Sequence, residues 1–431
     1  MSDVLSCYTD DWKRTGPDYV LYLPKRPCGP DGDNEHLHII TAPKSGDLLA
    51  SWTTGAYESA ANSRCVIARS ADGGRTWSDP IPLPGTDDGP MLNGRWGFFG
   101  VSRSGRLYYF FNRCLGFWDT SWTTNGALSC VVSDDDGQTW SARTNLPFYR
   151  REKYDHPDPK VPPAWIVWQP MIRDAQDRWI TGFTRWSSLS KFPYPKVGHH
   201  VDSRSELIRF DNLDDGPDPK DMILTWLPDG DSISVPCPVE PEKSKGYSLA
   251  EEPAIVRLPD GRLFLIVRTR TGHIWYTVSD NHGHSWRDTE ILRRFDDGPL
   301  MLHPKSPCPL YRFSDGRFIL FFHNHDGTGY GAAGPHDMNA RRPVFVSVGE
   351  FRPGKHQPIW FSEPRRLFDT DGVALGPGNG TIEGGRNWLA LYGCLTERDG
   401  EIVLWYPDRK HFLLGKRLTN ERMAGMVVPK G

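Results

Sequence analysis

"SADGGRTW" at residues 70–77 decides the fold, because two later octets repeat its pattern of Ser-x-Asp/Asn-x-Gly-x-Ser/Thr-Trp. The others are "SDDDGQTW" at 133–140 and "SDNHGHSW" at 279–286. Their starting positions differ by 63 and then by 146 residues, and 146 is close to two intervals of 73. Internal repetition of this kind identifies an array of equivalent structural units. We therefore expect one degenerate copy between the second and the third octet.

A second repeat consists of a strand, a turn that contains Gly or Asp, and another strand. It recurs in six segments: "TAPKSGDLLASW", "VSRSGRLYYFF", "IRDAQDRWITGF", "VRLPDGRLFLIV", "YRFSDGRFILFF" and "TERDGEIVLWY". Each octet follows an apolar segment ("CVIA", "SCVV" or "WYTV"), as the turn between the third and fourth strands of a small antiparallel sheet would. Six hairpins predict about six sheets.

The residues of the octets suit a structural role in that turn. The Asp or Asn side chain can accept hydrogen bonds from backbone N–H groups, Gly supplies a positive φ, and Trp fills the gap between hairpins. We therefore expect Trp77, Trp140 and Trp286 to be buried stability residues that lie away from any ligand cleft.

The predicted fold is all-β: a single β-propeller domain of four-stranded antiparallel blades over residues 1–431. Abundant Gly, Pro and aromatic residues suit many short strands joined by turns and disfavour a helical bundle. The last unit has three strands, "WLALYGCL", "EIVLWY" and "HFLLGKRL". We expect "DYVLYLP" at 18–24 to supply the fourth strand and close the ring, since each sheet buries both faces only against its neighbours.

Composition and charge exclude several classes of partner. The formal net charge is −3 and no run of five or more like charges occurs, so we expect no nucleic-acid partner and no membrane partner. No apolar stretch reaches the roughly 18 residues of a membrane span, and the N-terminus lacks a basic start followed by an apolar region. The expected location is the cytoplasm, or outside the cell if a signal peptide has been removed, and the expected state is a monomer.

The eight cysteines are scattered without a CxxC pair, which argues against a zinc cluster or a redox motif. We expect them to be free thiols, several of them buried in apolar strands. The segment "HNHDG" at 323–327 resembles a metal-binding cluster, but such residues at a loop tip more often form turn hydrogen bonds. We expect no required cofactor and no catalytic metal, and a structural calcium ion stays an open alternative.

The three octets resemble the Asp-box of the sialidase-like β-propellers, which bind ligands at the inner strands and their loops. In sialidases the first inner strand carries one of three arginines that hold a carboxylate. Here "DNEHLHII" at 33–40 has His36 and His38 and no arginine, which argues against a sialic-acid hydrolase. The family's other landmarks are matched by Glu252 in "EEPAIVRLPDGRL", Arg268 in "LFLIVRTRTG", Arg341 or Arg342 in "NARRPVFVSV", and Tyr392 in "LALYGCL".

Over nearly its whole length the sequence resembles the L-rhamnose-α-1,4-D-glucuronate lyases, some of which have also been described as α-L-rhamnosidases. The resemblance lies in "NEH" followed by "GDLLASWTTG", and in "DHPDPKVPPAWIVWQPMIRD", "GFTRW", "HPKSPCPLYR", "HQPIWFSEP" and "LWYPDRKHFLLGKR". It implies that His36 is the catalytic histidine and that the propeller has seven blades rather than six. It also implies a uronate-containing oligosaccharide or polysaccharide as the partner.

Lysis of a 4-linked glucuronate by β-elimination removes the C5 proton and expels the O4 substituent, giving rhamnose and a 4,5-unsaturated uronate. The site then needs a clamp on the C6 carboxylate, a base and an acid. His36 suits the base or the acid role and Tyr392 the other, while Arg268 and Arg342 can hold the carboxylate by bidentate pairing. The predicted site residues are His36, Tyr392 and Arg268 for catalysis and Trp168, Gln169, Glu252, His303, Asn324 and Arg342 for substrate binding.

Some of these roles have alternatives. Trp168 is expected to offer a stacking face, and Gln169 and Asn324 to orient sugar hydroxyls. Lining the cleft and capping a turn are equally compatible with His303, whereas His38 is expected to be a hydrogen-bonded core residue.

Four functions stay open: a lyase, an exo-α-L-rhamnosidase on the same linkage, a sialidase-like hydrolase, and a non-catalytic glycan-binding propeller. A lyase yields a product with a new double bond that absorbs ultraviolet light. A hydrolase yields none, and a binding protein forms no product.

Overall fold

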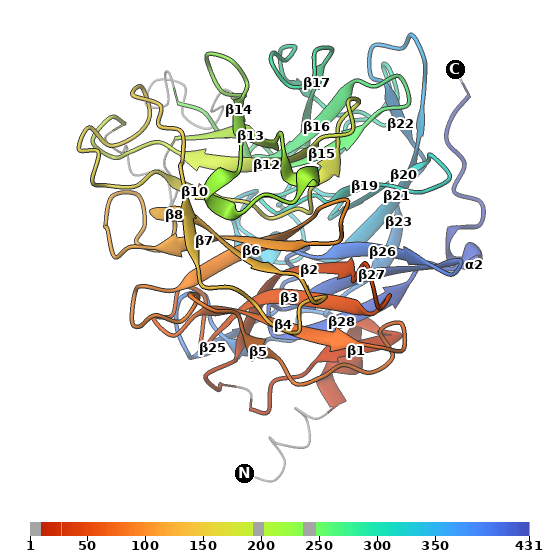
Figure 1. Cartoon of the computed structure of the whole chain (residues 1–431). Coiled ribbons are helices and arrows are strands. Elements are labelled where there is room, and N and C mark those ends of the chain that lie inside the picture. The colour runs from red at the N-terminus through yellow and green to blue at the C-terminus, as the bar shows by residue number, and fades with distance from the viewer. Residues whose placement is uncertain (1–9, 27, 193–201, 236–246, 431) are drawn as a thin grey trace.

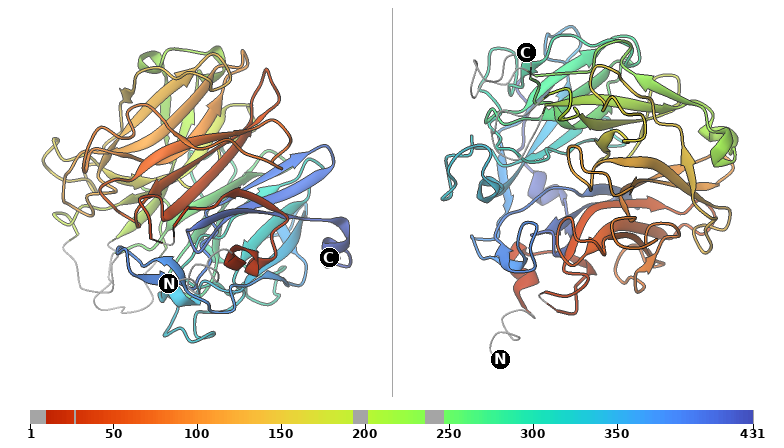
Figure 2. Two further views of the ribbon diagram at one scale, coloured as in Figure 1. Left: turned by 90° about the horizontal axis from the view of Figure 1, so that it is seen from below. Right: turned by 90° about the vertical axis from the view of Figure 1, so that its left-hand side faces the viewer.

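The computed structural model describes residues 10–26, 28–192, 202–235 and 247–430. Within these ranges the chain forms six sheets of four or five antiparallel strands. They follow one another in chain order around the molecule, so that the sixth sheet lies beside the first (Figures 1 and 2). The all-β, six-bladed propeller predicted from the hairpins is confirmed.

The first three blades come from the N-terminal half of the chain. Blade 1 contains β2 (Asp33–Thr41), β3 (Leu48–Gly55), β4 (Arg64–Ser70) and β5 (Ile81–Pro82). Blade 2 contains β6 (Gly94–Val101), β7 (Leu107–Cys114), β8 (Gly126–Ser133) and β9 (Thr144–Leu146). Blade 3 contains β10 (Ala164–Ile166), β11 (Ile172–Arg173), β12 (Trp179–Trp186), β13 (Ser203–Phe210) and β14 (Leu224–Leu227), with β10 and β11 both paired to β12.

The other three blades follow, and the last draws on both ends of the chain. Blade 4 contains β15 (Glu251–Arg257), β16 (Leu263–Arg268), β17 (Trp275–Ser279) and β18 (Glu290–Ile291). Blade 5 contains β19 (Leu310–Arg312), β20 (Phe318–Phe322), β21 (Val344–Phe351), β22 (Ile359–Phe361) and β23 (Arg365–Phe368). Blade 6 contains β26 (Cys394–Arg398), β27 (Glu401–Asp408), β28 (Phe412–Arg417) and β1 (Tyr19–Tyr22).

The seven blades implied by the resemblance are wrong for the described residues. The chain between blades 5 and 6 forms only the two-stranded hairpin of β24 (Leu375–Pro377) and β25 (Gly384–Arg386), which is too short to make a blade. The helical elements are single turns: η1 (Trp12–Thr15), η2 (Leu213–Asp215), η3 (Pro219–Asp221), η4 (Met338–Ala340) and α2 (Asn420–Met423). None of the described helices is long and apolar enough to cross a membrane.

Strand β1 is the outer strand of blade 6. It pairs antiparallel with β28, with Tyr19 opposite Gly415 and Val20 opposite Leu414. In Figure 1 the red β1 lies beside the blue strands of the last blade. The first strand of the described residues therefore completes the last sheet.

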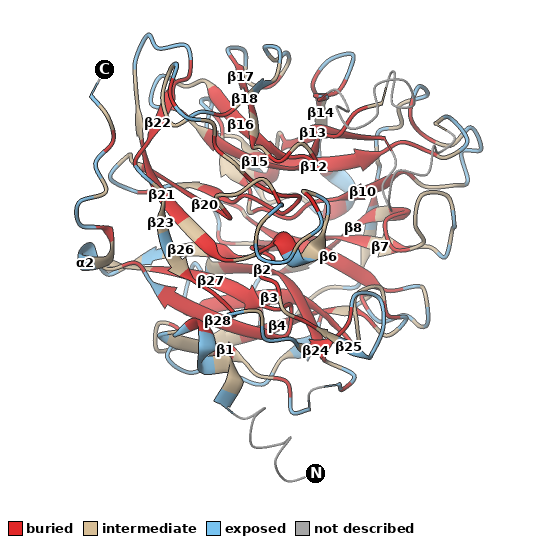
Figure 3. Ribbon diagram, turned by 180° about the vertical axis from the view of Figure 1, so that it is seen from behind, coloured by how far each residue is buried: buried red, intermediate tan, exposed pale blue. Residues whose placement is uncertain are grey.

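The blades are held together by apolar residues on both faces of each sheet, as the red strands of Figure 3 show. Every residue of β3 is buried, for example. Between blades 6 and 1 one cluster joins Trp52, Leu37, Trp405 and Leu413. Such a sheet is stable only between two neighbours, because burial of its second face contributes about 25 cal/mol for each Å² of apolar surface.

The three octets form the expected turns between third and fourth strands. In the first, Asp72 accepts hydrogen bonds from the N–H (2.9 Å) and the hydroxyl (2.6 Å) of Thr76. Gly74 has φ +93°, and a Cβ there would lie 2.7 Å from the ring of Trp405, so only glycine fits. In blade 3 the matching turn, where the degenerate copy was expected, holds η2 and η3 in place of an octet.

The tryptophans of the octets are less buried than predicted. Trp77, Trp140 and Trp286 are all of intermediate exposure, since each covers the outer edge of the turn in which it lies. The indole N–H of Trp77 donates to the carbonyl of Gly74 (3.1 Å), and its ring meets that of Trp405 edge-on. The indole N–H of Trp140 has no hydrogen-bond partner.

The cysteines of the described ranges are free thiols. Cys28 is exposed and the other five are buried in the strands and their connections. Cys7 and Cys237 lie outside the described residues.

Candidate active site

Three inner strands contain the same irregularity. His36 in β2, Trp96 in β6 and Glu252 in β15 have φ of +55°, +51° and +45°, and each sits in a β-bulge. The N–H of Trp96 donates to the hydroxyl of Thr53 (2.8 Å), and that of Glu252 to the hydroxyl of Thr184 (2.6 Å), so these bulges are tied to the preceding blade. Bulges re-aim side chains, and strained residues of this kind concentrate at functional sites.

The three bulged residues face one central cavity of about 550 Å³. Its wall includes carboxylates, basic groups and two imidazoles together with apolar rings. The lining residues include His36, Glu58, Trp96, Thr120, Trp186, Glu252, Arg268, Arg270, Lys305, His336, Arg341 and Tyr392. A cavity of this size with a few convergent polar groups fits a small polar ligand.

Tyr392 lies at the centre of a hydrogen-bonded group on this wall. Its hydroxyl donates to Glu252 Oε1 (2.8 Å) and accepts from Arg268 Nη1 (2.9 Å). Arg268 also forms ion pairs with Glu252 (2.6 Å) and Glu251 (3.0 Å). Burial and the negative charge of Glu252 raise the pKa of Tyr392, so the phenol keeps its proton at neutral pH.

His36 stacks on Tyr392. The ring centres are 4.2 Å apart with an interplanar angle of 25°, and the ring of Trp96 lies on another side at 5.9 Å. Neither ring nitrogen of His36 has a hydrogen-bond partner, although the side chain is only 3% exposed. Its Nδ1 lies 3.6 Å from Glu35 Oε2. A buried imidazole without partners is costly, and such an exception calls for a functional explanation.

A network of charged side chains lies next to His36. The ammonium of Lys410 contacts the carboxylate of Glu35 and lies 2.8 Å from that of Glu58. Burial raises the pKa of Glu35, but Lys410 and the neighbouring His36 outweigh it and hold that pKa well below its usual value. Glu35 therefore stays ionised, and its other oxygen accepts from the indole N–H of Trp96 (3.1 Å).

Two basic residues on the wall, Arg341 and Lys305, were left undecided or were not predicted from the sequence. Arg341, and not Arg342, lines the cavity, and its Nε donates to the carbonyl of Lys305 (2.9 Å). Arg342 instead pairs with Asp369 (2.9 and 3.0 Å) and does not line the cavity, so its predicted contact with a substrate carboxylate has no support here. Lys305 follows "LMLHP" in a connection without periodicity, and no sequence signal marked it.

Trp168 and Gln169 do not line the cavity. Trp168 is fully buried beneath Tyr392, with the two rings edge to face at 6.1 Å, and its indole N–H donates to the carbonyl of Pro253 (3.1 Å). Gln169 hydrogen-bonds to the backbones of blades 4 and 5. Both residues join blades, so the predicted sugar contacts of Trp168 and Gln169 have no support here.

His303 and Asn324 also lie outside the cavity lining. Nε2 of His303 donates to the carbonyl of Ser306 (2.9 Å), and its Nδ1 accepts from the N–H of His323 (3.2 Å). Burial lowers the pKa of His303 to about 3, so it is a neutral, fully bonded turn residue. Asn324 is half-buried with φ +54° at the end of β20. Its predicted contact with a sugar hydroxyl has no support either.

His38 is a core residue, as expected. It is 2% exposed and hydrogen-bonds to the backbone of Trp168, and burial lowers its pKa to about 3. Among the described residues, no group of three or more His, Cys, Asp or Glu side chains could hold a metal ion. The segment at 323–327 instead makes turn bonds, as where Nδ1 of His325 accepts from the N–H of Gly327 (3.1 Å).

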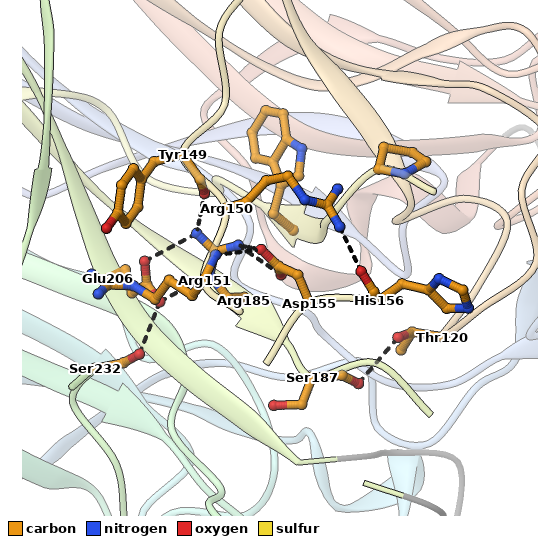
Figure 4. A network of polar contacts seen from close by, with 12 residues as sticks. Thr120, Tyr149, Arg150, Arg151, Asp155, His156, Arg185, Ser187, Glu206 and Ser232 are labelled. Atoms are coloured by element: carbon orange, nitrogen blue, oxygen red, sulfur yellow. Dashed lines mark hydrogen bonds and ion pairs between the residues drawn. The ribbon is translucent and has the colours of Figure 1, made fainter. Parts of the chain in front are cut away.

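Beside the cavity a buried ion network anchors the connection that precedes β10 (Figure 4). Arg185, which is fully buried, pairs with Asp155 (2.9 Å) and Glu206 (2.9 Å), and Arg151 pairs with the same Glu206 (2.9 Å). The hydroxyl of Thr120, which lines the cavity, donates to the carbonyl of Ser187 in blade 3 (3.3 Å). The rim is thus fixed to blade 3.

Comparisons with known proteins agree with this architecture. The family described as "BNR repeat-like domain" matches residues 46–374. Among solved structures, the Hadza microbial sialidase Hz136 is similar with a TM-score of 0.56 and 14% identity, over 90% of this chain and 66% of that chain. NanB sialidase from Streptococcus pneumoniae has a TM-score of 0.60 and 12% identity, over 93% and 70%. Trypanosoma rangeli sialidase has 0.56 and 11%, over 90% and 55%. No curated protein matches the sequence.

Proposed function

The chain belongs to the BNR repeat-like domain family, and from that premise we propose that it is a carbohydrate-active enzyme, a lyase of the L-rhamnose-α-1,4-D-glucuronate linkage. In the reaction the C5–H and C4–O4 bonds of glucuronate break and a C4–C5 double bond forms. O4 leaves with a proton as part of free rhamnose. The other product is a 4,5-unsaturated uronate, and no further reactant is consumed.

The stacking of His36 on Tyr392, with ring centres 4.2 Å apart, carries this proposal. In the glucuronate ring the C5 hydrogen and O4 lie on the same side. A base and an acid must therefore reach the substrate from one side. Two proton-transfer groups next to each other on one wall of the cavity meet that requirement.

The surroundings of the two rings suit different roles. Tyr392 suits the acid, since burial and the nearby carboxylate of Glu252 raise its pKa and keep the phenol protonated. His36 suits the base, because neither ring nitrogen has a hydrogen-bond partner and Nε2, unlike Nδ1, has no carboxylate of the described residues beside it, so Nε2 can accept the C5 proton. Arg268 is already engaged by Glu251 and Glu252, so it positions the tyrosine.

Arg341 and Lys305 are the groups that suit the substrate carboxylate. Both are buried on the cavity wall. A hydrogen bond from Arg341 Nε to the Lys305 carbonyl (2.9 Å) joins them. When the C5 proton leaves, negative charge spreads onto the carboxylate. Fixed cations in a site with little water stabilise that charge without reorganisation.

A sialidase-like hydrolase is the second candidate, and the hydrogen bond from Tyr392 to Glu252 (2.8 Å) favours it. A hydroxyl next to a carboxylate base is the arrangement of an activated nucleophile. The solved neighbours from Streptococcus pneumoniae and Trypanosoma rangeli are named sialidases.

One incubation separates the candidates. A rhamnosyl-glucuronate oligosaccharide is mixed with the protein, and ultraviolet absorbance and free rhamnose are followed together. The lyase produces both signals in equal amount, a hydrolase of this linkage releases rhamnose alone, and a sialidase-like hydrolase of another linkage or a binding protein produces neither. The rhamnosyl-glucose analogue, which lacks the carboxylate that makes the C5 proton acidic, is the control and should remain intact.

A further inference from the structure

Lys305 is a lysine held inside the cavity wall. It is 3% exposed, and it lies in the connection between blades 4 and 5. Its N–H donates to the carbonyl of Pro335 (2.6 Å), and its own carbonyl accepts from Arg341 (2.9 Å). The backbone is therefore held on both sides, and the side chain starts from a fixed point in the wall.

The charges around this amine are mostly of its own sign. No carboxylate of the described residues lies within 4.0 Å of Lys305, the distance of an ion pair. The guanidinium groups of Arg268, Arg270 and Arg341 act on it, and Glu251 is the opposing charge, itself paired with Arg268 at 3.0 Å. Burial and these guanidinium groups hold the pKa of the Lys305 amine well below its usual value.

Lys410 on another side of the same cavity is the internal comparison. It is equally buried, but it contacts Glu35 and lies 2.8 Å from Glu58. Burial lowers the pKa of Lys410, yet these two carboxylates outweigh it and raise that pKa above the usual value. A carboxylate beside a buried lysine thus decides whether the amine is charged.

We propose that Lys305 is an uncharged amine in the empty cavity and takes up one proton when a substrate carboxylate binds beside it. The inference rests on the proposed function for the acid-bearing sugar. The incoming carboxylate places a negative charge beside Lys305, as Glu35 and Glu58 do beside Lys410. Arg341, which is bonded to the backbone of Lys305, directs the carboxylate to this side of the wall.

Proton uptake links affinity to pH. Over the interval between the pKa of the free and of the occupied site, the affinity for an acid sugar falls about tenfold for each unit of rising pH. An uncharged sugar shows no such fall. The other groups that could titrate on this cavity are His36, Glu58, Glu252, His336 and Tyr392, so the test must assign the proton to Lys305.

The experiment is calorimetric titration with D-glucuronate in buffers of different ionisation enthalpy, which gives the protons taken up for each ligand bound. At pH values between the pKa of Lys305 in the free site and its pKa in the occupied site, we expect about one proton for the parent protein and none for the methyl ester of glucuronate. Lys305→Met, close in size and apolar, should bind without uptake. Lys305→Arg, charged throughout, should bind without uptake and with an affinity independent of pH.

Lys416→Met is the matched control. Burial also lowers the pKa of Lys416, but it contacts the carbonyl of Gly16, far from the cavity lining, and its loss should leave proton uptake unchanged. Binding by the parent protein without uptake overturns the proposal, as does uptake that persists in both Lys305 variants. If glucuronate does not bind and rhamnosyl-glucuronate is not cleaved, the proposed function fails too. Turnover of rhamnosyl-glucuronate without proton uptake refutes the role of Lys305 and leaves the proposed function standing.

Discussion

Lowering the pH from 7 to 5 is expected to reduce the free energy of unfolding by several kcal/mol, because the fold buries histidines in their neutral form. Burial lowers the pKa of His38 and His303 to about 3 and that of His411 to about 4. It also lowers the pKa of His323. In the unfolded chain each histidine regains its usual value of 6.5 and binds a proton below it. Stability is therefore fully present above pH 6.5 and is lost as the pH falls.

The size of the loss follows from proton linkage. At pH 5 an unfolded histidine is about 1.5 pH units below its pKa, which costs the folded state about 2 kcal/mol for each neutral histidine. His38, His303, His323 and His411 together then contribute about 8 kcal/mol, and the sum is insensitive to their folded pKa as long as each stays below about 4. Asp33 acts in the opposite direction, since burial raises its pKa to about 7 despite Arg386. Protonation of Asp33 offsets about 2 kcal/mol of this loss, which leaves a net loss of about 6 kcal/mol.

Urea denaturation at pH 7 and pH 5 measures this loss as a difference between two free energies of unfolding. His303→Gln, whose amide can replace both ring nitrogens, should reduce the difference by about 2 kcal/mol even if it lowers stability at both pH values. The same change at the exposed His356 is the control. An unfolding free energy at pH 5 that equals or exceeds the value at pH 7 refutes the reasoning.

Five other changes test the site and the fold. His36→Asn, which tolerates φ +55° better than Ala, should reduce turnover of rhamnosyl-glucuronate about 10²–10⁴-fold with the fold intact, as circular dichroism can check; near-parent turnover contradicts the assignment. Tyr392→Phe should likewise lose turnover, because it removes the phenolic proton, and should also lower stability by about 1–3 kcal/mol, because Glu252 and Arg268 each lose a buried hydrogen bond; a variant with full activity excludes Tyr392 as the acid. Deletion of residues 1–24 removes β1 and exposes β28, so the protein should become insoluble or melt markedly lower; parent-like melting contradicts closure by β1. Trp77→Ala should cost about 2 kcal/mol in urea denaturation, roughly half the value for a fully buried tryptophan, and Trp140→Ala less, since its indole has no hydrogen bond to lose; equal costs count against the bond to Gly74.

The parts of the fold that depend on local chemistry could be predicted from the sequence. Turns with Gly and Asp fixed the six hairpins, and the octets identified the connection between third and fourth strands, because each turn is specified by residues next to it. Blade number followed from those turns. The count of seven came from resemblance alone, and the short hairpin of β24 and β25 does not supply the extra sheet.

The site was less accessible from the sequence, for two physical reasons. Alternation along "DNEHLHII" gives no sign of the bulge that turns His36 into the cavity and leaves His38 in the core. Arg341 and Arg342 are neighbours in a short connection, and only the packing of Arg342 against Asp369 decides between them. Lys305 lies outside any strand, where neither periodicity nor turn chemistry predicts the direction of a side chain.

The pairing of β1 with β28 has a consequence for how the protein folds during its synthesis. Tyr19 and its partner Gly415 are nearly 400 residues apart, so β1 leaves the ribosome long before the strand it needs exists. At typical rates of synthesis of 5–20 residues per second, it waits roughly 20–80 seconds with an open edge. During that time the five earlier blades can assemble without a closed ring. Until the last strand emerges, the nascent chain is a row of blades with an unpaired sheet at each end. Chaperones or a second nascent chain can bind to these exposed edges.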